Sequence, residues 1–452
     1  MSTDTTSSLL ISNCTAITMN PDLAVLPSAW VSVSDGLITR VADTPPDEGG
    51  HATVIDGSGK VLIPGIVNAH THLWQTLIRG KYELIPFTDW LAAIYACDLT
   101  ADDCALSARL GALESVRSGV TTIVDHQFIH RGSDLAHGAI EGLLSIGIRS
   151  VVARTIMDGG AIVPRTAQET VESGLASVSE LMSEYKSERE SGMLTIMTGP
   201  NTPGVSASLE TAQATIAFCR DNGIRQSMHL AESTTVRQAV RERFGDDGVV
   251  QWLAAGDALG PETLAAHCVD LTATDIAVLA ERGVTVSHNP VSNLFLADGF
   301  APMPEMRDAG IVVGLGTDGA ASNNSQDMFE VLKFATLLQR ARTGRADVLQ
   351  PMESLKLATL DGARAVGVDH LVGSIETGKR ADLVLLDLHR CAHNVAVHDP
   401  VSALVHTARP CDVDTVLVDG RVLLRDGRPT TVDEDALLRQ AQDAGEALLR
   451  RL

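Results

Sequence analysis

The 452-residue sequence predicts an α/β barrel of parallel strands with a smaller β-sheet module beside it. Apolar, strand-like segments alternate with amphipathic helical segments from Pro64 to about Val368. Short strands of alternating polarity, separated by Asp-Gly and Gly-Ser-Gly turns, come before this region, and similar strands return after it. The length and the 44% hydrophobic content are sufficient for one large barrel plus a smaller domain.

The two ends of the chain supply the predicted β module. Residues 8–63 contain the segments LLISNCTAITM, WVSVSDGLITRVAD and TVIDGSGKVLI, and strands return after Gly373 in GSIETGKRADLVLLDL and VDTVLVDGRVLL. A helix is expected from Asp433 to Leu452. The two strand blocks can pair into one sheet although they are far apart in the sequence. We therefore expect three sections, 1–63, 64–370 and 371–452.

The central section has room for eight barrel strands. We place them at residues 62–68, 120–126, 149–155, 193–199, 224–230, 263–269, 284–288 and 312–318. One helix is well delimited at 101–117, because Thr100 can act as its N-cap, Asp103 stands at the third position and Gly119 follows its end.

Five metal-capable side chains follow apolar strands in this region: His70, His72, His229, His267 and Asp318. Side chains two apart on a strand project to the same face, so His-Thr-His can direct two nitrogens at one ion. The carboxyl ends of parallel barrel strands meet at one rim, which would bring the others to the same place.

The alternative is that these are ordinary core or surface histidines, as any one of the 14 histidines taken singly would be. The ordered series H-x-H, H-x-x-E, H and T-D-G, each part following apolar residues, favours one hydrolytic metal site instead.

Composition excludes several other classes of protein. A net charge of -22 disfavours nucleic acid and acidic membranes as partners. No segment has the roughly 18 uninterrupted apolar residues of a membrane span, and the first residues do not resemble a signal peptide, so a cytoplasmic protein is expected. The seven cysteines are odd in number and form no CxxC pair, which argues against a disulfide framework and against a thiolate zinc site.

Several motifs resemble the amidohydrolase superfamily, in the branch of guanine, 8-oxoguanine and S-adenosylhomocysteine deaminases and of s-triazine hydrolases. They are PGIVNAHTHLWQTLIRG, HLAES, SHNPVSNLFLADGFAP, GTDGAASNNSQDMFE and GSIETGKRADLVLLDL, and they span nearly the whole chain. The resemblance implies a (β/α)8 TIM barrel, a composite β-sandwich formed from both chain ends, and a divalent ion, usually zinc and sometimes iron.

Binuclear members of that family bridge two ions with a carboxylated lysine at the end of the fourth strand. Here that strand ends in Thr198-Gly199-Pro200-Asn201, and no lysine occurs between Lys186 and Lys333. We therefore expect a mononuclear site. The resemblance implies that its ligands are His70, His72, His229 and Asp318, and that His267 binds either the metal or the water or substrate.

The expected chemistry is attack by water activated on the ion, since a catalytic zinc lowers the pKa of bound water from 15.7 to about 7. Glu232 lies three residues after His229 and is the candidate general acid/base. The alternative is a surface glutamate that opens a helix. The resemblance implies that His288 orients the attacking hydroxide and that Asp318 shares the proton transfer; His288 could instead simply bond loop carbonyls.

Aromatic and polar residues near the strand ends suggest a flat heterocyclic substrate. Aromatic rings crowd the loop after the first strand, Trp74 and Trp90 among them, although they could equally form the loop's own core. Gln75, His126 and Arg154 are positioned to read ring substituents, and the resemblance implies substrate contacts for Gln75 and His126. Phe295 and Asp298 replace a basic or polar residue and a serine of nucleoside deaminases, which puts a full nucleoside in doubt.

The sequence thus predicts a metal-dependent deaminase of a purine-, pterin- or s-triazine-like heterocycle. Alternatives are displacement of chloride or an alkylamine from a triazine, hydrolysis of an amide or urea bond, and an inactive metal-stabilised scaffold. We expect a small-molecule substrate and a homodimer or larger homo-oligomer.

Overall fold

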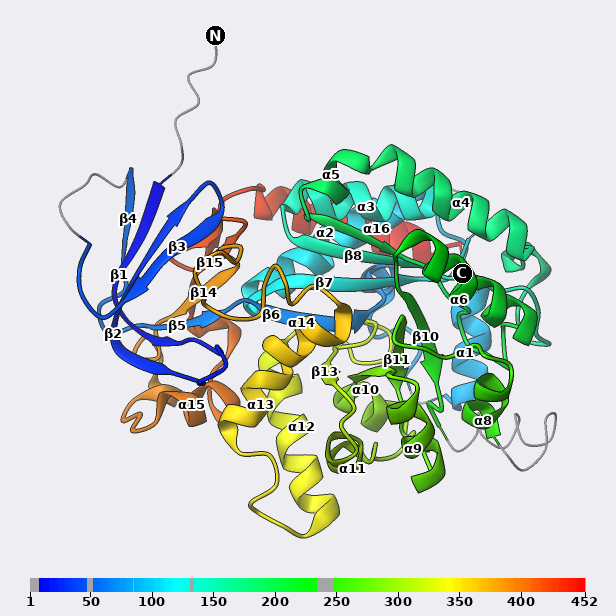
Figure 1. The fold of residues 1–452 in the computed structure, drawn as a ribbon. Helices are drawn as coiled ribbons and strands as arrows, with labels where there is room; N and C mark the ends of the chain where they lie inside the picture. Colours follow the sequence, from blue (N-terminus) through cyan, green and yellow to red (C-terminus); the bar gives the residue numbers. More distant parts are fainter. Residues whose placement is uncertain (1–7, 47–51, 84, 131–133, 234–247, 452) are drawn as a thin grey trace.

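The computed structural model describes residues 8–46, 52–83, 85–130, 134–233 and 248–451, and its central part is built on two four-stranded parallel sheets (Figure 1). The first sheet contains β6 (Ile66–Thr71), β7 (Val120–Gln127), β8 (Arg149–Arg154) and β9 (Leu194–Met197). The second contains β10 (Gln226–Leu230), β11 (Thr263–His267), β12 (Thr285–His288) and β13 (Val313–Leu315). Every predicted barrel strand overlaps one of these.

Backbone contacts join the two sheets on both sides. The residue after β9, Thr198, bridges to Gln226 of β10. On the other side β13 packs beside β6, and the amide of Asp318 donates a hydrogen bond to the carbonyl of His70 at 2.9 Å. The eight strands therefore close into the predicted (β/α)8 barrel, and the second junction places a candidate ligand next to another.

Helices surround the barrel and follow its strands (Figure 1). They are α1 (Phe87–Ala96), α2 (Ala101–Arg117), α3 (Asp134–Ile146), α4 (Val171–Glu184), α5 (Lys186–Glu190), α6 (Leu209–Asn222), α8 (Gly248–Ala255), α9 (Ala273–Glu281), α10 (Pro290–Phe295), α11 (Met303–Asp308), α12 (Met328–Thr343), α13 (Pro351–Leu357) and α14 (Leu360–Val366). The prediction for α2 is confirmed in full, because Thr100 and Asp103 form a reciprocal capping box at its start. The predicted C-terminal helix is present as α16 (Glu434–Leu449), with Asp433 as its N-cap, but it ends at Leu449 rather than continuing toward Leu452, which lies outside the described residues.

Strands from both chain ends form a nine-stranded sheet beside the barrel (Figure 1). It contains β1 (Ser8–Ile17), β2 (Val25–Ser34), β3 (Leu37–Ala42), β4 (Thr53–Asp56), β5 (Val61–Pro64), β14 (Leu383–Leu386), β15 (Val413–Val418), β16 (Arg421–Arg425) and β17 (Arg428–Pro429). The two halves meet where β5 pairs antiparallel with β14, with Ile63 opposite Val384. A separate apolar core, which includes Ile11, Leu62 and Leu385, packs against this sheet. The predicted pairing of the two terminal blocks is confirmed.

The prediction of one strand over residues 62–68 is wrong, because the chain changes sheets at Gly65. β5 belongs to the terminal sheet, whereas β6 belongs to the barrel. A Cβ at position 65 would lie 1.8 Å from the Oγ1 atom of Thr121, so only glycine fits where the chain passes the next barrel strand.

A buried ion pair joins the barrel to the terminal sheet. Arg149, at the start of β8, donates from Nε and Nη2 to the two carboxylate oxygens of Asp382 at 2.9 and 2.8 Å, and both side chains are buried. The bidentate geometry fixes the two parts in one orientation. Among the described residues, no helix is both long and apolar enough to cross a membrane.

Candidate metal centre and active site

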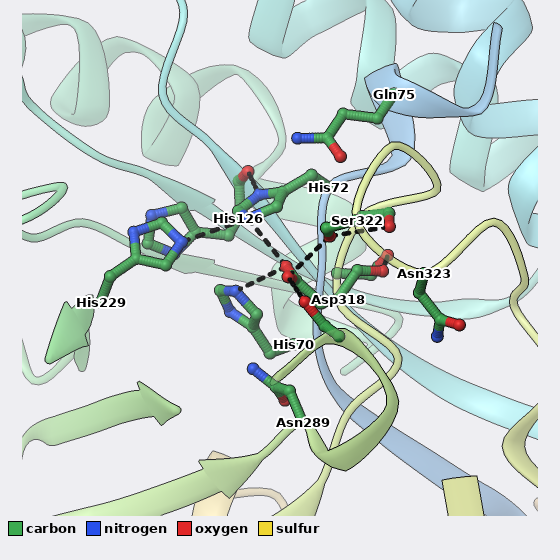
Figure 2. A network of polar contacts seen from close by, with 12 residues as sticks. His70, His72, Gln75, His126, His229, Asn289, Asp318, Ser322 and Asn323 are labelled. Carbon is green, nitrogen blue, oxygen red and sulfur yellow. Dashed lines mark hydrogen bonds and ion pairs between the residues drawn. The ribbon is translucent and has the colours of Figure 1, made fainter. Parts of the chain in front are cut away.

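The candidate ligands converge at the carboxyl ends of the barrel strands (Figure 2). His70 lies on β6 with His72 just after it, while His229 and His267 lie at or next to the ends of β10 and β11. Ligand atoms of His70, His72 and Asp318 lie within 4.8 Å of one another, and so do those of His70, His229 and His267. All five side chains are buried. The fold thus brings together the set that the sequence pointed to.

Hydrogen bonds to carbonyl oxygens orient two of these histidines. The Nδ1 atom of His72 lies 2.7 Å from the carbonyl oxygen of His126, and that of His229 lies 3.0 Å from the carbonyl oxygen of Asn201. A carbonyl only accepts, so Nδ1 carries the proton in each ring and Nε2 keeps its lone pair. These two Nε2 atoms are 3.2 Å apart. Two lone pairs at that distance are compatible with a shared cation.

Asp318 presents one carboxylate oxygen to the same point. Its Oδ1 atom lies 3.4 Å from Nε2 of His70 and 3.2 Å from Nε2 of His72. The hydroxyls of Ser292 and Ser322 donate to the other oxygen, Oδ2, at 2.6 and 2.7 Å. The backbone of Asp318 is in the left-handed region, with φ of 62°. Aspartate tolerates this conformation, which turns the carboxylate toward the histidines.

The spacing of these atoms fits a divalent cation. Ligands at 2.0–2.1 Å from a tetrahedral zinc ion lie about 3.3 Å apart. The Nε2 atoms of His72 and His229 are 3.2 Å apart. Oδ1 of Asp318 lies 3.4 Å from Nε2 of His70 and 3.2 Å from Nε2 of His72, so all three distances match this value. Both ring nitrogens of His70 and Oδ1 of Asp318 are buried without a hydrogen-bond partner among the described residues. The donor set therefore suits the predicted metal.

Burial and neighbouring charges set the protonation states of the candidate ligands. Burial lowers the pKa of His70 to about 3 and that of His229 well below its ordinary value, so both rings are neutral, as a metal-binding imidazole must be. Burial also opposes charge on His72, but the neighbouring Asp318 carboxylate outweighs it and raises the pKa of that ring. Burial likewise opposes ionisation of Asp318, but contacts with His70 and His72 hold its pKa well below the usual range. The carboxylate is ionised.

Glu232 lies beside the ligands, as predicted. Its Oε1 atom is 3.6 Å from Nε2 of His267, and the side chain is buried. Burial raises the pKa of the Glu232 carboxyl. The Nδ1 atom of His267 lies 2.9 Å from Oδ1 of Asn293, which directs Nε2 toward Glu232. The alternative of a surface glutamate is wrong, because the side chain is buried, and the helix that it would open lies outside the described residues from Thr234 onward.

Two further buried side chains near the site each leave polar atoms without a hydrogen-bond partner in the described part of the chain. His288, the last residue of β12, is buried with both ring nitrogens unpaired, and burial lowers its pKa to about 3. The alternative that the ring bonds loop carbonyls is therefore not observed among the described residues, and both nitrogens can bond a polar molecule in the site. Asp298 is buried with Oδ2 unpaired. Burial and the nearby Glu232 and Asp318 carboxylates raise the pKa of Asp298 to about 9.

Gln75 points its amide toward the ligand cluster (Figure 2). Its Oε1 accepts a hydrogen bond from the amide of Ala321 at 3.2 Å, while Nε2 is buried and unpaired within the described structure. Trp74 is buried, also with an unpaired Nε1, and its ring meets the ring of Phe128 edge to face. Phe128 in turn contacts His72. These residues form an aromatic wall beside the metal ligands, with polar groups left for a substrate.

Other predicted substrate contacts have protein partners instead. Trp90 donates from Nε1 to the carbonyl of Ala321 at 3.1 Å and stacks on Phe87, as expected for the core of a loop. Phe295 and Phe300 are 39% and 51% exposed, so they do not enclose a buried ring.

His126 and Arg154 are also engaged by the protein. The two ring nitrogens of His126 contact Ser227 and Asn201 at 3.0 and 3.2 Å, and its ring packs against that of His229. Arg154 makes a bidentate ion pair with Glu169, with one bond of 2.7 Å. Glu169 thus engages the two terminal nitrogens of Arg154, while Nε is buried without a hydrogen-bond partner in the described structure. The carbonyl of His126 contacts His72, and its ring nitrogens are held by neighbouring side chains.

The residues that orient the candidate ligands were not predicted from the sequence. Ser292, Asn293 and Ser322 bond Asp318 or His267, and Asn201 bonds His229 through its carbonyl. The signal for the first three was present in the polar loops NPVSNL and GAASNN that follow the last two barrel strands, where hydroxyls and amides stand next to predicted ligands, whereas nothing local marked the carbonyl of Asn201.

Comparison with known proteins agrees with this site. Residues 61–423 match the model of the amidohydrolase family. The chain belongs to the amidohydrolase family. It is 38% identical over 421 residues to the 5'-deoxyadenosine deaminase of Methanothermobacter thermautotrophicus, covering 92% of this chain and 94% of that one. It is 36% identical over 428 residues to the 5-methylthioadenosine/S-adenosylhomocysteine deaminase of Desulforudis audaxviator, covering 93% and 94%.

Solved structures of amidohydrolase relatives superpose on nearly the whole chain. A zinc-bound adenosine deaminase from Xanthomonas campestris has a TM-score of 0.90 at 28% identity, covering 98% of this chain and 99% of that one. The zinc complex of atrazine chlorohydrolase from Arthrobacter aurescens also has a TM-score of 0.90, at 26% identity, covering 97% and 100%. The predicted enzyme class, a metal-dependent hydrolase acting on carbon–nitrogen bonds, is confirmed.

Proposed function

We propose that this amidohydrolase removes an amino group from an N-heterocycle by attack of water on the ring carbon, with release of ammonia. The observation that carries the proposal is the position of Glu232, buried 3.6 Å from His267 and adjacent to the converging ligand atoms. A leaving amine needs a proton, and a buried carboxyl whose pKa is raised can both take one from water and deliver it.

The ligands of one divalent ion, zinc or alternatively iron, would be His70, His72, His229 and Asp318. When bound, such an ion supplies Lewis-acid activation that lowers the pKa of the attacking water to about 7. The chain has no lysine between Lys186 and Lys333 to bridge a second ion.

The other buried polar side chains would transfer protons, orient the water and bind the substrate. Glu232 moves the proton from the water to a ring nitrogen and on to the amine. His288, neutral and unpaired among the described residues, orients the water. Gln75 and Asp298 each leave an unpaired polar atom and would hold ring substituents. A protonated Asp298 would donate to a ring nitrogen or carbonyl at neutral pH.

An adenine-type ring is the first substrate class to test, because the relatives that cover most of this chain are deaminases of 5'-deoxyadenosine and 5-methylthioadenosine or S-adenosylhomocysteine. Triazine hydrolysis is the second candidate, supported by TM-scores of 0.90 to 0.91 with triazine hydrolases.

The test is a coupled assay for ammonia with the metal-loaded enzyme. The panel should contain 5'-deoxyadenosine, free adenine, an aminopterin-type ring, an amino-triazine and its chloro analogue. Ammonia from any amino compound supports deamination. Release of chloride or alkylamine with no ammonia from the whole panel would refute deamination and support the second candidate.

A further inference from the structure

A second cluster of metal-binding side chains lies outside the barrel strands, in the segment between β14 and β15. It consists of Cys391, His393, Cys411 and Asp412. Cys391 immediately precedes a 3-10 turn at Ala392–Asn394, which contains His393. Cys411 and Asp412 belong to a second such turn at Pro410–Asp412, just before β15. One ligand atom of each residue lies within 4.8 Å of one from each of the others. The proposed reaction uses none of these groups.

The two sulfur atoms are spaced as ligands of one ion. Both cysteines are free, and their Sγ atoms lie 3.7 Å apart. Thiolates bound at about 2.3 Å to a tetrahedral zinc ion are about 3.8 Å apart. A covalent bond between them would need a distance of about 2.05 Å. The pair therefore matches a shared cation more closely than a bond between the sulfurs.

Asp412 provides the independent observation that points to a ligand. Its side chain is fully buried, and Oδ2 accepts hydrogen bonds from Nε2 of His393, Nδ2 of Asn394 and the amide of Arg409, at 2.8, 2.8 and 2.9 Å. Oδ1 is buried with no hydrogen-bond partner in the described structure. One oxygen is saturated and the other is free, so the carboxylate can orient the imidazole and still meet a cation.

We propose that Cys391, His393, Cys411 and Asp412 form a structural site for a zinc-type cation. The ion would tie the turn after β14 to the turn before β15, and so close the loop that contains α15 (Pro400–His406). The proposal departs from the expectation that the cysteines form no thiolate zinc site, because its ligands come from two short motifs, Cys-Ala-His and Cys-Asp, rather than from CxxC. A redox pair would use the sulfurs alone and would not require the converging imidazole and carboxylate.

Cobalt substitution tests this site separately from the active site. Reduced, metal-stripped full-length protein is titrated with Co²⁺ and followed by near-ultraviolet absorption. Only a thiolate ligand produces a sulfur-to-cobalt charge-transfer band, and the active-site ligands are nitrogen and oxygen atoms. We expect the absorbance of this band to stop rising once the cysteine site has bound one equivalent of Co²⁺.

The variants Cys391→Ser and Cys411→Ser each keep one thiolate and should weaken the charge-transfer band, whereas the double variant Cys391→Ser/Cys411→Ser should lose it while keeping the cobalt spectrum of the active site. His393→Asn should bind cobalt at least about tenfold more weakly at the cysteine site. His389→Asn, an exposed histidine on the same loop, is the matched control and should bind like the wild type.

Absence of the band from the reduced wild-type protein would overturn the proposal, as would a band that survives both cysteine substitutions. Loss of two thiols on mild oxidation in a protein that gives no cobalt band would identify a redox pair instead. Circular dichroism of the variants checks that each one folds. None of these outcomes depends on whether the enzyme deaminates any heterocycle.

Discussion

Replacing Glu232 by glutamine should separate proton transfer from every other function of the site. The amide is nearly isosteric and keeps hydrogen-bonding capacity toward His267, which lies 3.6 Å away. It cannot carry a proton from water to the ring. A positioned proton-transfer group contributes at least roughly 10²-fold, so ammonia release should fall by that factor or more. This corresponds to about 2.7 kcal/mol of transition-state stabilisation.

The structure also predicts the sign of the stability change. Burial raises the pKa of Glu232, which means that the folded protein disfavours the charged form. Removing that charge should therefore leave the melting temperature unchanged or higher. Metal content should stay the same, because Glu232 is not a proposed ligand.

The assay is steady-state kinetics with an amino substrate and its chloro analogue, together with metal analysis and thermal unfolding. Chloride leaves without a proton, so the chloro compound should lose less activity than the amino compound. The control is Asp327→Asn, a half-buried carboxylate at the start of α12, which should release ammonia at the wild-type rate. Wild-type deamination by Glu232→Gln would remove this residue from the mechanism. Equal losses on both substrates would assign it to attack or ring protonation and not to departure of the amine.

Three further predictions concern metal and pH. His229→Ala and Asp318→Ala should each lose turnover together with bound metal, measured by elemental analysis after dialysis; full metal content with wild-type rates would contradict the ligand assignment. The double variant Cys391→Ser/Cys411→Ser should retain about one equivalent of ion, at the active site, and two tightly held ions in that variant would disprove a mononuclear centre. Burial raises the pKa of Asp327 from 3.8 to about 6, so its contribution to stability is fully present below pH 3.8 and is lost as pH rises toward 6. Relative to the wild type, Asp327→Asn should gain at most about 3 kcal/mol of unfolding free energy across that interval, followed by urea denaturation at several pH values; a difference that does not vary with pH would contradict this.

The barrel and most of the ligand cluster could be predicted from local sequence. Apolar strands alternate regularly with helices, and parallel strands in a barrel place their carboxyl ends at one rim. This is why His229, His267 and His288 could be placed together before any coordinates were considered. Each one stands at or beside the end of its own strand.

Features that depend on a distant partner could not be predicted in this way. VLIPGIV is apolar throughout, so nothing local shows that the chain leaves one sheet and enters another at Gly65. Arg154 and Val152 are two apart on β8 and so face the same side of the strand, where Val152 packs with the helices. Every residue of β8 is buried, so polarity does not show that Arg154 faces the helices and not the barrel interior. Glu169, its partner, lies in the loop before α4. The pairing of Cys391 with Cys411 likewise depends on two turns that only the tertiary fold brings together.

The pairing of β5 with β14 has a consequence for how the protein is made. β5 lies between β1 and β14 in the sheet, and the second of these neighbours is encoded near the other end of the chain. During synthesis the strands of residues 8–64 leave the ribosome before β14, so one edge of β5 remains without a hydrogen-bonding neighbour until Leu383–Leu386 has been translated. An open, apolar edge strand readily pairs with other chains. Yield in a cell should therefore depend on the speed of elongation and on chaperones that cover this edge, and chains truncated before Leu383 should aggregate even when all eight barrel strands are present.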